Sequence, residues 1–241
     1  MPRALTVLAC LTVLAAAAPA ARAVVPGAAR VLETAAEAAP HAEPFVANLV
    51  EAPPDRAAPR LAMRIASDGA GRLRVDRQLL GTAETTTTWY GPVGAPGVQP
   101  LDTAPLWILY LAGRPLEPLL AARQVDRDRT SLDHADEIVL WVLGAGPREP
   151  DRPQLAVERD SGRLRRLVER TGPPESAIVT TTTLSGSQAA EGPASRWPER
   201  VTTRTGEAEP THWRVAWLRF GEAPDASELS PPAPPPVPGA P

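Results

Sequence analysis

Few residues of this chain have the types and spacing that catalysis or metal binding requires. The histidines, His41, His134 and His212, lie far apart, and none is followed by a second histidine or cysteine at metal-ligand spacing. The segment Asp133-His134-Ala135-Asp136 brings acids beside a histidine, but short Asp-rich segments commonly form turns. We therefore expect surface or turn histidines rather than a metal site.

The remaining candidates for chemistry are serines and arginines. No serine lies in a G-x-S-x-G pattern, so a nucleophile elbow is not expected. The chain contains no lysine, which excludes Schiff-base lysine chemistry and phosphate-binding P-loops. Arg163, Arg165 and Arg166 could contact phosphate head groups, or could form a solvated strand face. We expect no catalytic residue, no metal and no cofactor, and a protein that is not an enzyme.

Length and charge set further limits. A chain of 241 residues suffices for one large domain or two small ones, and a net charge of −3 gives no sign of a nucleic-acid partner. Residues 1–23 have the pattern of a secretory signal peptide: Arg3, an apolar segment, and an Ala-x-Ala cleavage site ending at Ala23. Cleavage there removes Cys10, the only cysteine, and with it any disulfide. We expect an exported protein located in the periplasm.

The elements that could position a site centre on residues 136–170. Residues 136–143 form an apolar run of strand-forming residues that ends at Gly144. Residues 154–159 alternate between apolar and polar side chains, and residues 163–169 return as a partner strand. Asp160-Ser161-Gly162 between them suits a three-residue hairpin loop with glycine in the left-handed region.

The apolar run is informative because both of its faces are apolar. A solvated antiparallel strand would alternate, so something must cover each face of residues 136–143. One interpretation is an ordinary core strand beneath a helix. The other is a strand with one face lining an apolar cavity. Periodicity does not separate these two interpretations.

The flanking segments predict more strands and an apolar helical pair. Residues 24–51 favour helix, with a break at Pro40 and a second short helix over residues 43–50. Two helices are expected after Thr103 and after Pro115, and the first is apolar on all sides and so must be buried. Strands are expected over the remaining segments, which are residues 60–66, 71–79, 85–90, 176–184, 200–205 and 211–220.

This order of elements resembles the periplasmic lipoprotein-carrier (LolA-like) superfamily, which includes the outer-membrane lipoprotein-sorting chaperone. The likeness rests on two segments within residues 27–222. Pro105-Leu-Trp-Ile-Leu-Tyr110 through Leu120 is similar to the helical lid of that superfamily, and residues 151–164 are similar to its hairpin with a D-x-G turn. The chain departs from the pattern in its long proline-rich stretches.

The resemblance implies an α+β fold that is mainly antiparallel β, a curved incomplete barrel with helices covering its concave face. It implies a single domain over residues 24–230. The proline-rich residues 231–241 show no pattern, and we expect them to form a disordered tail. The implied function is to hold acyl chains of a lipid or lipoprotein in an apolar cavity. Its predicted lining is Leu106, Trp107, Leu109, Tyr110, Leu140, Val142, Trp213 and Trp217.

The partners that follow are lipid or lipoprotein acyl chains, with envelope membrane proteins as further partners, and the protein is expected to act as a monomer. Each predicted lining residue could instead belong to a closed core. The alternative function is then a non-enzymatic envelope sensor or scaffold, which would use the same fold to bind a protein partner on its outer face.

Overall fold

The computed structural model describes residues 25–54, 57–189 and 191–231. The predicted signal peptide, and all of the predicted tail except Pro231, lie outside this part of the chain.

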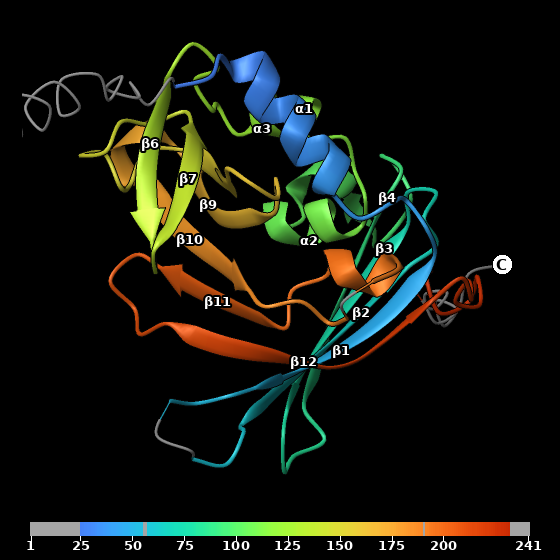
Figure 1. Ribbon diagram of the computed structural model, residues 1–241. Coiled ribbons are helices and arrows are strands. Elements are labelled where there is room, and N and C mark those ends of the chain that lie inside the picture. Colours follow the sequence, from blue (N-terminus) through green and yellow to red (C-terminus); the bar gives the residue numbers. More distant parts are fainter. Residues whose placement is uncertain (1–24, 55–56, 190, 232–241) are drawn as a thin grey trace, which may run out of the picture.

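One sheet of twelve strands forms the body of the molecule (Figure 1). Its strands pair antiparallel, except that β5 pairs parallel to β4. The spatial order is β5-β4-β3-β2-β1-β12-β11-β10-β9-β8-β7-β6, and the two end strands do not pair with each other. In chain order the strands are β1 (Phe45–Glu51), β2 (Leu61–Ser67), β3 (Leu73–Leu79), β4 (Thr85–Gly91), β5 (Gln99–Pro100), β6 (Thr130–Ala135), β7 (Ile138–Leu143), β8 (Gln154–Glu158), β9 (Leu164–Thr171), β10 (Ile178–Ser185), β11 (Arg200–Thr205) and β12 (Thr211–Phe220).

The sheet consists of two meanders that meet at a single seam. Strands β1 to β5 form one, and β6 to β12 form the other, so most strands pair with their neighbours in the sequence. The first and last long strands make the seam, where Phe45 lies opposite Phe220 and Glu51 opposite Trp213. The register shifts between Asn48 and Leu49, which marks a β-bulge within the seam.

The helices lie inside the curve of the sheet (Figure 1). They are α1 (Ala28–Ala38), α2 (Leu106–Leu111) and α3 (Leu116–Ala122). Every residue of α2 is buried, as expected of a helix that is apolar on all sides. Three 3₁₀ turns complete the secondary structure, η1 (Leu101–Thr103), η2 (Pro174–Ser176) and η3 (Pro193–Arg196). The helices and the inner face of the sheet share one hydrophobic core.

The predicted fold class is confirmed: the structure is α+β, mainly antiparallel, with a curved open sheet and helices on its concave face. The predicted helical pair is also confirmed, although α2 begins at Leu106 with Pro105 as its N-cap, whereas Ala104 or Pro105 was predicted as its first residue. In the described part of the chain, no helix combines the length and apolar character needed to cross a membrane.

The helix predicted over residues 43–50 is wrong, because this segment is strand β1. Phe45 packs into the main core, whereas its neighbour Val46 packs on the opposite face with Ala66 and Leu229. A strand at the centre of a sheet buries both faces, so its apolar residues need not alternate with polar ones. A short run of this kind has no periodicity that separates strand from helix.

The central hairpin is confirmed, with β8 and β9 joined at Asp160-Ser161-Gly162 and Gly162 at φ +70°. The prediction that both faces of the apolar run are covered is also confirmed. Leu143 packs with the helices, whereas Leu140 and Val142 belong to a separate cluster with Ala145 and Ala156. The sequence reading missed β6, whose hairpin with β7 turns at two residues of positive φ, Asp136 and Glu137.

The end of the described chain packs against the outer face of the sheet. Leu229 is 3% exposed and lies against Val46 and Ala66. Glu228 forms an ion pair with Arg64 at 3.3 Å, and its carbonyl accepts a hydrogen bond from Arg74 at 3.1 Å. The segment around Glu228 and Leu229 thus braces β1, β2 and β3 from outside.

Candidate ligand-binding cavity

A cavity of about 400 Å³ lies between the concave face of the sheet and the start of α2. It is near the start of β2, the end of β9, the end of β11 and the start of β12. Its walls come from both meanders of the sheet, from the first turn of α2 and from the end of α3. The lining residues are Leu61, Met63, Arg77, Thr103, Ala104, Pro105, Trp107, Arg123, Glu169, Thr171, Thr180, Thr203, Thr205, Thr211 and Trp213.

Two tryptophans give the cavity its largest apolar surfaces. Trp107 projects from α2 and Trp213 from β12, and both are buried members of the main core. Met63 of β2 is also buried there. Large aromatic side chains offer wide apolar surfaces, so this part of the lining suits the hydrocarbon portion of a ligand.

A buried ion pair holds the helical part of the wall against the sheet. Glu169 on β9 is 4% exposed, and its Oε2 lies 3.0 Å from Nε of Arg123. The backbone N–H of Leu106 donates to Oε1 of Glu169 at 3.1 Å, and a guanidinium N–H of Arg123 donates to the carbonyl of Ala104 at 2.8 Å. Glu169 thereby binds an N–H group that the start of α2 leaves without a helical partner, and Arg123 binds a carbonyl of the segment that leads into the helix.

Threonine hydroxyls line the remainder of the cavity. Thr180 lies opposite Thr205 across β10 and β11, with their hydroxyl oxygens 3.4 Å apart. Thr203 lies opposite Thr211 across β11 and β12. Each hydroxyl can donate one hydrogen bond and accept others, so this part of the lining suits polar groups of a ligand.

The structure brings two of the predicted lining residues, Trp107 and Trp213, to this cavity. Leu106 is buried beside it, and its backbone N–H binds Glu169. Leu109 lines a different groove, beneath Pro115 and Leu119.

The other predicted residues lie elsewhere. Leu140 and Val142 belong to the cluster separate from the main core. Trp217 was expected on the same face as Trp213, and this is wrong: the register shift in the seam turns Trp217 outward. It is 38% exposed, with Arg219 5.2 Å from its ring centre. Whether the predicted set binds a ligand stays a prediction.

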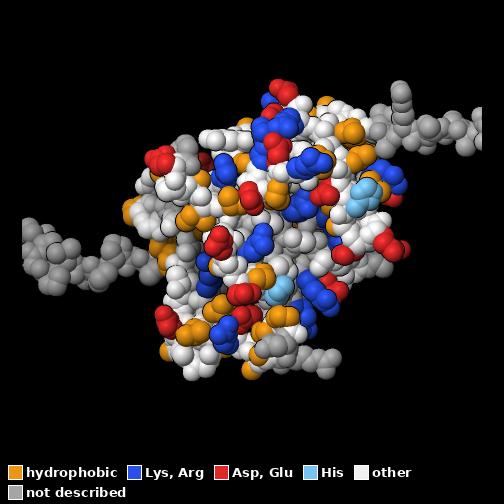
Figure 2. Space-filling view, turned by 90° about the vertical axis from the view of Figure 1, so that its left-hand side faces the viewer, with side chains coloured by type: hydrophobic (Ala, Val, Ile, Leu, Met, Phe, Trp, Pro, Cys, Tyr) orange, Lys and Arg blue, Asp and Glu red, His pale blue; other side chains and the backbone are white. Residues whose placement is uncertain are grey.

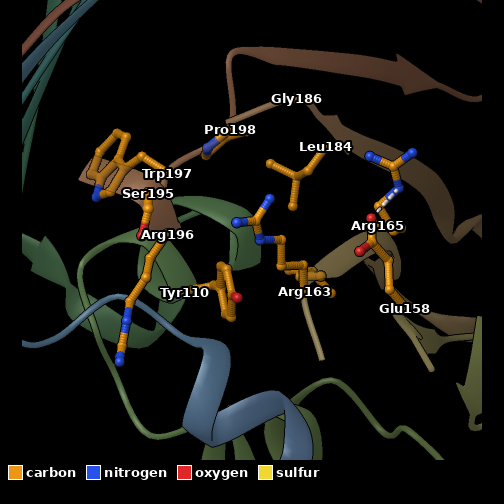
Figure 3. Close-up of a pocket in the computed structure, with 11 residues that line it drawn as sticks. Tyr110, Glu158, Arg163, Arg165, Leu184, Gly186, Ser195, Arg196, Trp197 and Pro198 are labelled. Atoms are coloured by element: carbon orange, nitrogen blue, oxygen red, sulfur yellow. Dashed lines mark ion pairs between the residues drawn. The ribbon is translucent and has the colours of Figure 1, made fainter. Parts of the chain in front are cut away.

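Tyr110 lines a small pocket between α2 and the β9–β11 region (Figure 3). The pocket holds about 20 Å³, room for about one water molecule, so it does not suit an acyl chain. Burial raises the pKa of the Tyr110 hydroxyl to about 12, despite a hydrogen bond with the backbone of Leu164 and nearby arginines. Arg165 at the pocket edge is paired with Glu158 at 3.3 Å.

The candidates for chemistry are dispersed in the structure. Within residues 25–54, 57–189 and 191–231, no group of three or more His, Cys, Asp and Glu side chains could hold a metal ion. Nδ1 of His212 lies 3.1 Å from the hydroxyl of Thr202. The Asp133 carboxylate forms an ion pair with Arg166 at 2.6 Å and accepts a hydrogen bond from the backbone N–H of His134 at 2.8 Å. Partial burial opposes ionisation of Asp133, but the hydrogen bond and charge of Arg166 outweigh it and lower the pKa.

Acidic and basic side chains are interspersed over the face that lies on the left of Figure 1 (Figure 2). Two of the three arginines singled out in the sequence follow this pattern, since Arg165 pairs with Glu158 and Arg166 with Asp133. The third, Arg163, lines the small pocket beside Tyr110. Paired charges of this kind form a solvated surface more readily than a site for phosphate groups.

Sequence reasoning missed most of the polar lining, including Arg77, Arg123, Glu169 and the threonines. The threonine-rich run TTTTLS, which contains Thr180, indicated only a strand-forming segment. Glu169 could have been noted as an acid that breaks the apolar face of a strand predicted to be buried.

Comparisons with known proteins give similarity at the level of structure. No protein-family profile and no curated protein sequence matches the chain. A LolA superfamily protein from Nitrosomonas europaea is similar over 86% of this chain and 98% of its own, with 13% identity and a TM-score of 0.47. A domain from Vibrio parahaemolyticus that is described as an outer membrane lipoprotein-sorting protein domain is similar over 84% of this chain and 97% of its own, with 10% identity and a TM-score of 0.44.

Proposed function

We propose that this protein is a non-enzymatic carrier that holds acyl chains of a lipid or lipoprotein in its concave-face cavity. The observation that carries the proposal is the cavity of about 400 Å³ beside Trp107 and Trp213. Export through the predicted signal peptide places this carrier in the periplasm, where it acts as a monomer and exchanges cargo with envelope membrane proteins.

Burial of hydrocarbon would supply the binding free energy. Each methylene transferred from water to an apolar site contributes about 0.8 kcal/mol. The two tryptophans and Met63 supply apolar surface from α2, β12 and β2, so a chain in the cavity would contact both meanders of the sheet at once. Such binding needs no reactive group, which agrees with the dispersed histidines and acids.

Native mass spectrometry of the mature protein, purified from a bacterial envelope, tests the proposal. We expect retained mass that is released as acylated lipid, and uptake of a fluorescent acyl probe after delipidation. A retained lipid would also identify the cargo.

A matched pair of variants shows whether the cavity is the binding site. Thr180 lines the cavity, whereas Thr183 of the same strand is exposed and lies on the opposite face. We expect Thr180→Phe to fill the cavity and to reduce probe uptake at least tenfold, and Thr183→Phe to leave uptake unchanged. A clean apo mass without uptake, or equal effects of the two variants, would contradict the proposal.

A second candidate function is that of an envelope sensor or scaffold that binds a protein partner. The observation that favours it is Trp217, a large aromatic residue exposed on the outer face beside Arg219, since Trp and Arg are common at the centres of interfaces. A protein without lipid uptake, whose capture of one defined envelope protein is lost in Trp217→Ala, would support this second function.

A further inference from the structure

The positive and negative charges of the cavity lining do not cancel. Three of the lining residues carry charge: Arg77, Arg123 and Glu169. Arg123 and Glu169 form the ion pair at 3.0 Å, and so neutralise each other. The lining therefore keeps one positive charge, which belongs to Arg77.

Arg77 differs from Arg74, which is on the same strand β3, and from Arg64, which is on the neighbouring strand β2. On the outer face, Arg64 and Arg74 both lie within ion-pair distance of Asp76. Arg77 lies on the inner face, opposite Met63 of β2, and its side chain is exposed at the cavity. Its guanidinium makes no hydrogen bond or ion pair with any residue in the described ranges.

An unpaired guanidinium that remains solvated costs little in the free protein, and it presents five N–H donors to an incoming anion. The threonine pairs, Thr180 with Thr205 and Thr203 with Thr211, add hydroxyl donors to the same lining. Trp107 and Trp213 line the apolar part. The cavity thus joins an apolar region to a region of hydrogen-bond donors with a net positive charge.

We propose that the ligand is an amphiphile whose head group carries anionic oxygens, as a carboxylate or phosphate does. Arg77 and the neighbouring threonine hydroxyls bind these oxygens, while the hydrocarbon chain lies along Trp107 and Trp213. This inference rests on the proposed carrier function and narrows its cargo to anionic amphiphiles.

The test measures displacement of a neutral fluorescent naphthylamine probe from the delipidated mature protein. The competitors are hexadecanoate, hexadecanol of the same chain length, and inorganic phosphate. Arg77→Gln removes the charge from the cavity. Arg204→Gln is the matched control, because Arg204 is an exposed residue between the lining residues Thr203 and Thr205 and lies on the opposite face of β11.

We expect hexadecanoate to bind about tenfold more tightly than hexadecanol, a ratio equivalent to about 1.4 kcal/mol. Arg77→Gln should remove this preference and leave the affinity for hexadecanol unchanged, whereas Arg204→Gln should preserve it. The preference should also weaken as the salt concentration rises, because salt screens exposed charges.

Equal affinities for the acid and the alcohol, or equal losses of both in Arg77→Gln, would overturn the inference while leaving the carrier function intact. Competition by phosphate alone, without a preference between the two amphiphiles, would assign Arg77 to a free anion and likewise overturn it. Failure of both amphiphiles to displace the probe would overturn the carrier function itself, and the inference with it.

Discussion

Nε of Arg123, at the end of α3, lies 3.0 Å from Oε2 of Glu169 on β9, and both side chains also bind backbone groups beside the start of α2. The ion pair therefore anchors the start of α2, whose N-cap residue makes no capping hydrogen bond through its side chain. It also places the only carboxylate of the cavity lining beside a cation, so that the acid does not repel an anionic ligand.

Removal of Glu169 should destabilise the protein strongly. Glu169→Ala leaves Arg123 as a charge without a partner in a largely buried position, and frees the N–H of Leu106. Breaking a buried pair in this way costs about 3 kcal/mol. Urea unfolding measures the loss. Glu33→Ala, which breaks the exposed pair with Arg30, should change stability by less than about 0.5 kcal/mol, and equal effects of the two variants would contradict the role of Glu169.

Tyr110 should make the protein less stable at high pH. Because burial raises its pKa from 10.0 to about 12, the folded state keeps its proton at pH values where the unfolded state loses it. The resulting stability, about 3 kcal/mol for a shift of this size, is fully present below pH 10 and is lost as the pH rises to about 12. Tyr110→Phe should flatten the fall in unfolding free energy across this range, relative to wild type. A parallel fall in both proteins would refute the assignment.

Gly162 should tolerate no side chain. Its φ of +70° strains any L-residue, and a Cβ there would lie 2.4 Å from the carbonyl oxygen of Thr34 in α1. Gly81 has a similar φ of +85° but open space around it. We expect Gly81→Ala to cost about 1 kcal/mol from backbone strain alone, and Gly162→Ala to cost clearly more, as measured by thermal unfolding. Similar losses of stability in the two variants would show that the close contact between Gly162 and α1 adds nothing to the cost of a side chain there.

Leu229 should contribute to the stability of the sheet although it follows the last strand. Leu229→Ala removes buried methyl groups from the contact with Val46 and Ala66, and should cost about 2 kcal/mol. It should also expose the segment beyond β12 to limited proteolysis. Leu80→Ala, at a leucine that is 37% exposed, serves as the control and should have little effect on either measurement. If the Leu229→Ala variant resisted proteolysis as the wild type does, Leu229 would not hold this segment against the sheet.

The sequence predicted the parts of the fold that depend on local patterns. Alternation and turn residues located the hairpin that turns at Gly162, and the all-round apolar run located buried α2. The same rules failed for segments whose secondary structure is determined by tertiary contacts. Most of residues 43–50 lie in the central strand β1, whose two faces are covered by distant segments. Thr130–Ala135 form β6 through pairing with β7, despite their polar character.

The candidate site was predicted less well, for a physical reason. A strand's side chains alternate only while its register is constant, and the bulge opposite Asn48 turns Trp217 away from the face of Trp213. The sequence of β12 shows nothing of this bulge. Arg77 and Glu169 line the same cavity because the whole sheet curves and brings β3 and β9 to it. No local sequence pattern predicts that curvature.

The seam between β1 and β12 has a consequence for how the chain folds. Nearly all other ladders join strands adjacent in the sequence, and such contacts close only short loops. The pairing of Phe45 with Phe220 closes almost the whole chain, so it raises the contact order and should form late and limit the folding rate. Until it forms, β1 and β12 each present an unpaired edge to other chains.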